Sequence, residues 1–164
     1  MATIIGPNDG KAGELGSIGV RFMLWGEQSG GGVSVVEHPM PPRALAAPLH
    51  RHTREDEYSF VLEGCMGAQL GDEVVHASAG DFVFKPRDQW HTFWNAGDEP
   101  CRILELIAPA GFERFFAELV DADDEPSPES LAGLGARYGL EFDFESIPGL
   151  CARHGLRFPA GEMA

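Results

Sequence analysis

Short apolar runs rich in β-branched and aromatic residues recur along the first two thirds of the chain. Glycine, proline and aspartate separate neighbouring runs, as at Gly71-Asp72 and Gly97-Asp98, and these residue types favour turns. Many short strands at regular spacing predict an all-β fold, either a sandwich or a barrel. The predicted strands cover residues 18–25, 33–38, 46–52, 57–62, 66–70, 74–77, 82–85, 91–95 and 102–108.

After Pro109 the apolar positions change to a helical period. Phe112, Phe115, Phe116 and Leu119 recur at helical spacing, which predicts a helix with an aromatic face that must cover something. Capping residues and terminal glycines predict two further helices, over residues 127–139 and 146–154.

These two patterns divide the chain. We expect residues 1–110 to form N-terminal strands and a β-barrel, and residues 111–164 to form a helical extension that packs on the barrel within a single domain. The extension either covers the outside of the barrel, closes one of its mouths, or exchanges with a neighbouring subunit. The sequence leaves these alternatives open.

Three histidines and a glutamate in the predicted strands carry the candidate chemistry. Side chains alternate between faces along a strand, so His50 and His52 point the same way and can bind one ion. The polar stretch after them has the length of a turn, so Glu57 opens the next strand and returns toward the two histidines. With His91, they form a set of imidazole and carboxylate ligands without thiolate. Such a set suits a divalent transition metal, namely Fe, Mn, Ni, Co, Cu or Zn.

The spacing of these residues resembles the two motifs of the cupin superfamily. The first motif is matched by His50-x-His52-x4-Glu57-x6-Gly64, and the second by Gly80-x5-Pro86-x-Asp88-x2-His91-x3-Asn95. Ala44 stands where the first motif opens with glycine, upstream of every ligand. Asp88 replaces the middle glycine of the second motif, but aspartate also tolerates the backbone of a tight turn.

The resemblance implies the cupin double-stranded β-helix, a jelly-roll barrel, here with short C-terminal α-helices. It also implies that His50, His52, Glu57 and His91 are the ligands of one divalent transition metal. Among cupins, the chain is most similar to small single-domain quercetin-dioxygenase-like proteins. We therefore expect a dioxygenase-like oxidoreductase acting on a small hydroxylated aromatic or enol, with Glu57 also serving as general base.

Two other functions remain open. One is a metal-dependent isomerase, epimerase or lyase acting on a small polar metabolite such as a sugar or keto acid, whose activity would persist without oxygen. The other is a non-catalytic barrel that binds a small molecule. This fold carries many unrelated chemistries, so the resemblance supports the metal site better than any one reaction.

Strand alternation also predicts the surroundings of the metal. Ser59 and Val61 share a face with Glu57, and Phe93 shares one with His91, so these three residues are expected to line the substrate pocket. Trp90 and Trp94 have the opposite parity and are expected to pack outward, against another sheet or a second subunit. We expect a homodimer.

Some neighbouring polar residues are set aside. Glu55 and Asp56 compete with Glu57 for the carboxylate position, but the six-residue step to Gly64 favours Glu57. The remaining histidines are not assigned to the site, and they are His38, His76 and His154.

Composition narrows the partners. A formal net charge of −14 repels nucleic acid phosphates and anionic membrane surfaces, so we expect neither as a partner. Three separated cysteines favour neither a disulfide framework nor a thiolate metal site. The first residues lack the basic and apolar segments of a secretory signal, so we expect a cytoplasmic protein.

Overall fold

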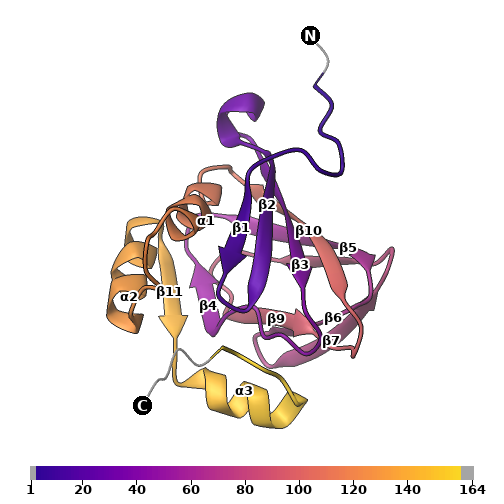
Figure 1. The fold of residues 1–164 in the computed structure, drawn as a ribbon. Helices are drawn as coiled ribbons and strands as arrows, with labels where there is room; N and C mark the ends of the chain where they lie inside the picture. Colours follow the sequence, from indigo (N-terminus) through magenta and orange to yellow (C-terminus); the bar gives the residue numbers. More distant parts are fainter. Residues whose placement is uncertain (1–2, 160–164) are drawn as a thin grey trace.

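Two antiparallel sheets enclose the centre of the molecule (Figure 1). The computed structural model describes residues 3–159, so the ends of the two predicted segments, residues 1–2 and 160–164, lie outside it. The elements are β1 Ala12–Leu15, β2 Ile18–Leu24, a 3-10 turn Gly26–Ser29, β3 Ser34–Met40, β4 Leu49–His52, β5 Asp56–Glu63, β6 Cys65–Leu70, β7 Glu73–Ser78, β8 Phe82–Lys85, β9 His91–Asn95, β10 Cys101–Ala108, α1 Glu113–Val120, α2 Pro128–Arg137, β11 Leu140–Asp143 and α3 Ser146–His154.

The strand order confirms the predicted all-β jelly roll. One sheet runs β1-β2-β3-β10-β5-β8 and the other runs β11-β4-β9-β6-β7. Non-consecutive neighbours such as β3 and β10 give the crossing connections of a double-stranded β-helix. None of the helices in the described part of the chain is long and apolar enough to span a membrane.

The inward-facing side chains of β5 and β10 divide the barrel interior into an apolar part and a polar part. Val61 and Ile103 face inward in the apolar part, and fully burying such a side chain stabilises the fold by about 1.5–3 kcal/mol. Farther along the same strands, Ser59 lies opposite Glu105, and Glu57 lies opposite Ile107. Packing alone favours apolar side chains at such inward positions, so the polar ones indicate a functional role.

Two turns explain the residues of the cupin-like motifs. Gly64 has φ +80°, and a Cβ there would lie 2.7 Å from the carbonyl oxygen of Pro100, so glycine is required. Asp88 also adopts a left-handed conformation, with φ +65°. Its N–H donates to the His52 carbonyl oxygen at 2.7 Å. The replacement of glycine by aspartate therefore preserves the turn and ties it to the strand that carries two candidate ligands.

The extension after residue 110 places helices against the barrel and adds a strand to one of its sheets. Helices α1 and α2 and strand β11 lie beside β1 and β4, at one side of the barrel, whereas α3 lies below β9 (Figure 1). Strand β11 was not predicted, because its four residues sit between two helices and its partner β4 is far away in sequence. It pairs with β4 so that Leu140 lies opposite His52 and Phe142 lies opposite His50.

The prediction that Trp94 packs against another sheet or a second subunit is wrong. Its side chain points out of the barrel but is only 1% exposed, because α3 of the same chain covers it. Trp94 packs with Ile147 and Leu150 and stacks on His154 at a ring distance of 4.5 Å. Gly67 makes room for the indole, since a Cβ there would lie 2.1 Å from its nitrogen. Trp90, by contrast, is partly exposed, with the Arg51 guanidinium over its ring.

Candidate metal centre and cavity

The four predicted ligands converge between the two sheets. His50 and His52 extend from the same face of β4, and His91 of β9 lies opposite His50 in register. Glu57 reaches them from β5 in the other sheet. One ligand atom from each residue lies within 4.8 Å of the others, and all four residues are buried. Strands distant in sequence thus bring three imidazoles and one carboxylate to one point.

Backbone carbonyls fix the orientation of two of the rings. The carbonyl oxygen of Pro48 accepts a hydrogen bond from His50 Nδ1 at 2.8 Å, and that of Gln89 accepts one from His91 Nδ1 at 3.1 Å. A carbonyl oxygen can only accept, so each Nδ1 carries the hydrogen and each Nε2 keeps a lone pair. Burial lowers the pKa of His50 well below its usual value and also lowers that of His91, which favours neutral ligands.

Close contacts inside the cluster fit a bound cation. Glu57 Oε1 lies 3.3 Å from His52 Nε2, and Glu57 Oε2 lies 3.2 Å from His91 Nε2. For a neutral His91 ring whose hydrogen is on Nδ1, the second contact sets a lone pair against a carboxylate oxygen. A divalent metal ion among these atoms satisfies both groups. The donor set suits Fe, Mn, Ni, Co, Cu or Zn and does not choose among them.

The carboxylates around the cluster have distinct places. Glu57 joins the histidines, whereas Asp56 lies toward the surface and pairs with Arg87 at 2.8 Å. Glu55 lies on the other side of His52, with its Oε2 3.7 Å from His52 Nδ1. Neither of these two buried atoms has a hydrogen-bond partner in the described part of the chain. Glu55 therefore lies beside the His52 ring and outside the four-residue cluster.

A buried lysine balances the charge beside the cluster. Lys85 of β8 is fully buried, and its Nζ lies 3.4 Å from Glu57 Oε2 and 2.7 Å from Glu105 Oε1. The other oxygen of Glu105 accepts a hydrogen bond from the Ser59 hydroxyl at 2.8 Å. The Lys85 ammonium also lies over the Phe93 ring, 4.4 Å from its centre.

These contacts shift the two carboxyl groups in opposite directions. Burial alone would raise the pKa of Glu57, but the neighbouring His52 and Lys85 side chains hold it well below its usual range. Burial, reinforced by the nearby Glu57, raises the pKa of Glu105 to about 7 despite the Lys85 ammonium. Glu57 is therefore ionised at neutral pH, whereas Glu105 holds a proton part of the time.

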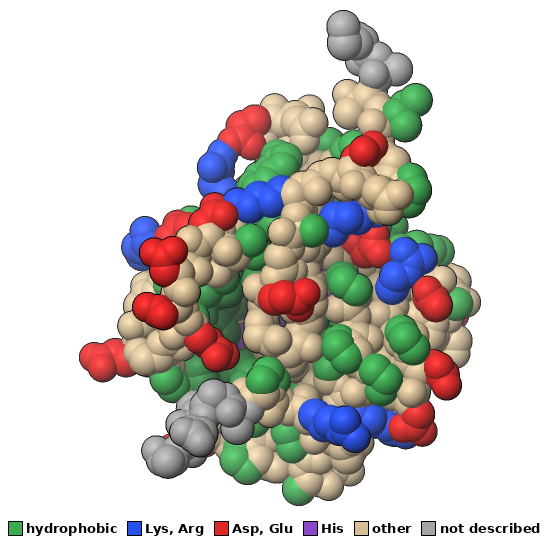
Figure 2. Space-filling model, viewed as in Figure 1, with side chains coloured by type: hydrophobic (Ala, Val, Ile, Leu, Met, Phe, Trp, Pro, Cys, Tyr) green, Lys and Arg blue, Asp and Glu red, His purple; other side chains and the backbone are tan. Residues whose placement is uncertain are grey.

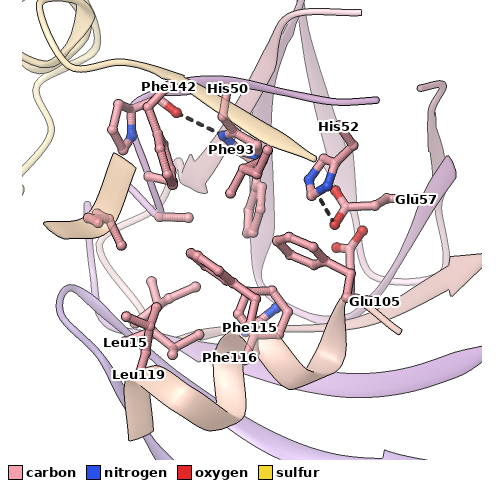
Figure 3. A pocket seen from close by; sticks show the side chains of 18 of the residues that line it. Leu15, His50, His52, Glu57, Phe93, Glu105, Phe115, Phe116, Leu119 and Phe142 are labelled. Carbon is pink, nitrogen blue, oxygen red and sulfur yellow. Dashed lines mark hydrogen bonds and ion pairs between the residues drawn. The ribbon is translucent and has the colours of Figure 1, made fainter. Parts of the chain in front are cut away.

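The cluster lies at one end of a cavity of about 120 Å³. Aromatic and aliphatic side chains form most of the remaining walls, together with His38 and Glu105, and Figure 3 shows several of the aromatic side chains facing His50, His52 and Glu57. Figure 2 shows a hollow lined with hydrophobic side chains between the helical extension and the neighbouring strands. The apolar lining residues are Leu15, Ile18, Ala46, Ala47, Pro48, Phe93, Phe112, Phe115, Phe116, Leu119, Leu131, Leu140, Phe142 and Phe158.

The predicted pocket residues lie at different depths. Phe93 forms part of the cavity wall. Ser59 lies behind the wall, where it donates to Glu105, and Val61 belongs to the apolar core of the barrel. Sequence reasoning did not assign His38 to the site, yet this residue borders the cavity. Its inward parity on β3 was the available signal.

Comparisons with known proteins agree with the fold. Residues 36–107 match the family model described as a cupin domain. The structure is similar to that of KdgF from Halomonas sp., with a TM-score of 0.60 and 17% identity, covering 70% of this chain and 99% of the other. The nucleoside dehydratase Pac13 gives a TM-score of 0.56 at 15% identity, covering 70% and 88%. Residues 36–107 thus resemble the cupin domain, and the fold as a whole is similar to that of these two proteins.

Two curated relatives match part of the chain. The tetracenomycin polyketide synthase protein TcmJ of Streptomyces glaucescens is 30% identical over 83 residues, which cover 51% of this chain and 54% of the relative. The oxidoreductase iacF of Pestalotiopsis fici is 34% identical over 100 residues, covering 51% and 49%. The chain thus spans about half the length of each of these relatives.

Proposed function

We propose that this protein is a metal-dependent, dioxygenase-like oxidoreductase acting on a small hydroxylated aromatic or enol. The observation that carries the proposal is the buried cluster of three histidines and Glu57 at the end of a cavity with aromatic walls. Apolar walls favour a planar carbon skeleton, and the cluster favours its oxygen-bearing end. The names of the two relatives, one a polyketide synthase protein and one an oxidoreductase, support polyketide-like phenols and enols as substrates.

The proposed mechanism assigns the first proton transfer to Glu57. A divalent metal held by the three histidines and Glu57 would supply Lewis-acid and redox chemistry to a bound substrate. The Glu57 carboxylate accepts the proton of the substrate hydroxyl, while Lys85 and His91 hold its Oε2 in place. Loss of this proton raises the electron density of the substrate. The apolar walls exclude water from the reacting end.

Metal content tests whether the cluster of three histidines and Glu57 binds a metal. Inductively coupled plasma mass spectrometry on tag-free protein should find about one equivalent of a transition metal, as a single preformed site requires. His50→Ala should lose it. His76→Ala is the matched control, because His76 is an exposed histidine on β7, outside the cluster, and this variant should keep the metal. If neither the wild type nor the control contains or takes up metal, the proposal fails, and the alternative of a non-catalytic binding module is favoured.

Oxygen dependence tests whether the protein catalyses a dioxygenase-like reaction. Metal-loaded protein should consume oxygen with flavonols or polyketide-like enols, and Glu57→Gln should reduce turnover more than substrate affinity. The same reactions in the absence of oxygen should give no turnover. Turnover that persists without oxygen would replace the proposal with the alternative of a metal-dependent isomerase, epimerase or lyase.

The proposal includes a homodimer. The outer face of β5 and β8 carries Phe82 and Phe84, which are 57% and 48% exposed, and Tyr58, whose ring stacks on Phe84. Exposed aromatic patches of this kind support a partner surface. Sedimentation analysis should give a dimer for the wild type and a monomer for a variant with both phenylalanines changed to serine. A monomeric wild type would contradict this part of the proposal.

A further inference from the structure

His38 is a buried polar residue that the proposed mechanism does not use. It lies on β3, is 1% exposed and borders the cavity. Its ring sits between two aromatic walls, 6.1 Å from the Phe93 ring and edge-on to the Phe116 ring at 5.3 Å. A histidine enclosed in this way by apolar side chains requires hydrogen-bond partners for its two nitrogens.

One nitrogen of His38 has a partner, and the other does not. Nδ1 lies 2.9 Å from the carbonyl oxygen of Gly19 on β2, so Nδ1 carries the hydrogen and donates it. Burial lowers the pKa of His38 to about 4, so the ring is neutral near pH 7. Nε2 is then a fixed acceptor, and no group within residues 3–159 donates a hydrogen bond to it.

The other polar groups that line the cavity are already engaged. His50, His52 and Glu57 belong to the metal cluster, and Glu105 is held by Lys85 and Ser59. His38 Nε2 is therefore the acceptor left for a ligand. A ligand hydroxyl is the natural partner, because an acceptor with a fixed lone pair binds an O–H donor and gains nothing from a carbonyl or ether oxygen.

We propose that His38 is a specificity-determining residue that accepts a hydrogen bond, at Nε2, from a second phenolic hydroxyl of the substrate. This inference rests on the proposed function and narrows its substrate class. The substrate would be a polyhydroxylated aromatic, with one oxygen-bearing end at the metal cluster and a separate hydroxyl at His38. A site built around such an acceptor disfavours analogues that lack the hydroxyl, since the lone pair facing the cavity is then left without a partner when the analogue binds.

Two substitutions separate recognition from packing. In His38→Asn, the side-chain amide can replace Nδ1 as donor to Gly19 while Nε2 is removed. In His38→Gln, the longer side chain places an amide oxygen near the position of Nε2. The probes are the parent flavonol, whose one hydroxyl belongs to the chelating end, and kaempferol, which carries three further phenolic hydroxyls. Dissociation constants come from fluorescence titration of metal-loaded protein, with metal content measured in each sample.

We expect the wild type to bind kaempferol more tightly than the parent flavonol. His38→Asn should weaken kaempferol binding by roughly tenfold, as the loss of one hydrogen bond predicts, and should leave metal content and parent flavonol binding unchanged. His38→Gln should recover part of the preference.

A preference for kaempferol that survives in His38→Asn would overturn the inference. Equal weakening of both probes would also overturn it, because that result indicates a packing role. These two outcomes leave the proposed function standing. If neither probe binds the wild type, the proposed substrate class fails, and this inference fails with it.

Discussion

The two ends of the cavity come from different parts of the chain and are held by different kinds of interaction. The end with the candidate metal cluster lies within residues 36–107, which match the cupin domain model, and there backbone carbonyls and ion pairs fix the directions of His50, His91 and Glu57. The apolar end comes largely from the extension, through Phe115 and Phe142, whose contacts are non-directional. Residues 36–107 therefore supply the polar cluster, whereas the extension supplies much of the apolar wall.

The largest expected effect comes from removing the charge balance of the metal end. Lys85→Met leaves Glu57 and Glu105 buried together without a cation, so metal-free protein should lose about 3–5 kcal/mol of unfolding free energy at pH 7. Urea denaturation measures this loss. Lys11→Met is the matched control, because Lys11 forms an exposed pair with Asp121 worth at most about 1 kcal/mol. Equal losses in the two variants would refute the proposed role of Lys85.

A substitution in the extension should separate substrate binding from metal binding. Phe115 joins α1 to Tyr138, which follows α2, and to Phe142 of β11, so Phe115→Ala should cost about 3 kcal/mol of stability. Flavonol binding should fall while metal content stays unchanged. Phe115→Leu keeps most of the apolar volume and should cost less than about 1.5 kcal/mol. Loss of metal from a folded Phe115→Ala protein would show that the two ends are not separable.

A smaller effect is expected at Glu55. Its Oε2 lies 3.7 Å from His52 Nδ1, and we expect loss of this neighbouring carboxylate to lower metal affinity by roughly 10–100-fold, as removal of a group beside a metal ligand does. Competition between protein and chelator for Zn(II) measures the change in Glu55→Ala. Glu55→Gln retains an acceptor and should recover part of the affinity. Unchanged Zn(II) affinity in Glu55→Ala would mean that His52 needs no such support.

The smallest effect concerns acid stability of the barrel. Burial alone would raise the pKa of Glu37, but hydrogen bonds from Arg21 and Arg102 outweigh burial and lower it. A lowered pKa contributes stability above the unfolded value of about 4.3, and this contribution disappears as pH falls through the folded value.

Glu37→Gln should therefore be less stable than wild type at pH 7, with the deficit shrinking below about pH 4.3. Urea unfolding across this pH range measures both the deficit in unfolding free energy at pH 7 and its decrease at lower pH. Glu63→Gln is the control, because Glu63 is exposed and pairs with the same Arg102. A deficit in Glu37→Gln that is independent of pH would contradict the assignment.

The parts of the molecule that sequence predicted are those set by local rules. Alternation along β4 placed His50 and His52 together, and the turn before Glu57 returned it to them. The left-handed backbone at Asp88 agrees with the expectation that aspartate can replace glycine there. The sequence pattern also predicted the aromatic face of α1, but it did not predict which part of the molecule this face covers.

The parts that sequence missed depend on partners distant along the chain. Strand β11 forms because β4 offers it hydrogen bonds, and its own residues give no periodic signal over so short a length. Trp94 is buried by α3, which begins 52 positions after it. His38 borders the cavity because Gly19 fixes one side of its ring and two phenylalanines enclose it.

Strand β11 has a further consequence for the chain as a whole. Without it, β4 would be the last strand of its sheet, with open N–H and C=O groups beside two histidines, and such an open edge invites pairing with another protein molecule. β11 occupies that edge, is only four residues long, and carries Glu141 and Asp143 as exposed charges. The segment that shapes the cavity thus also covers the open edge of the strand that carries His50 and His52.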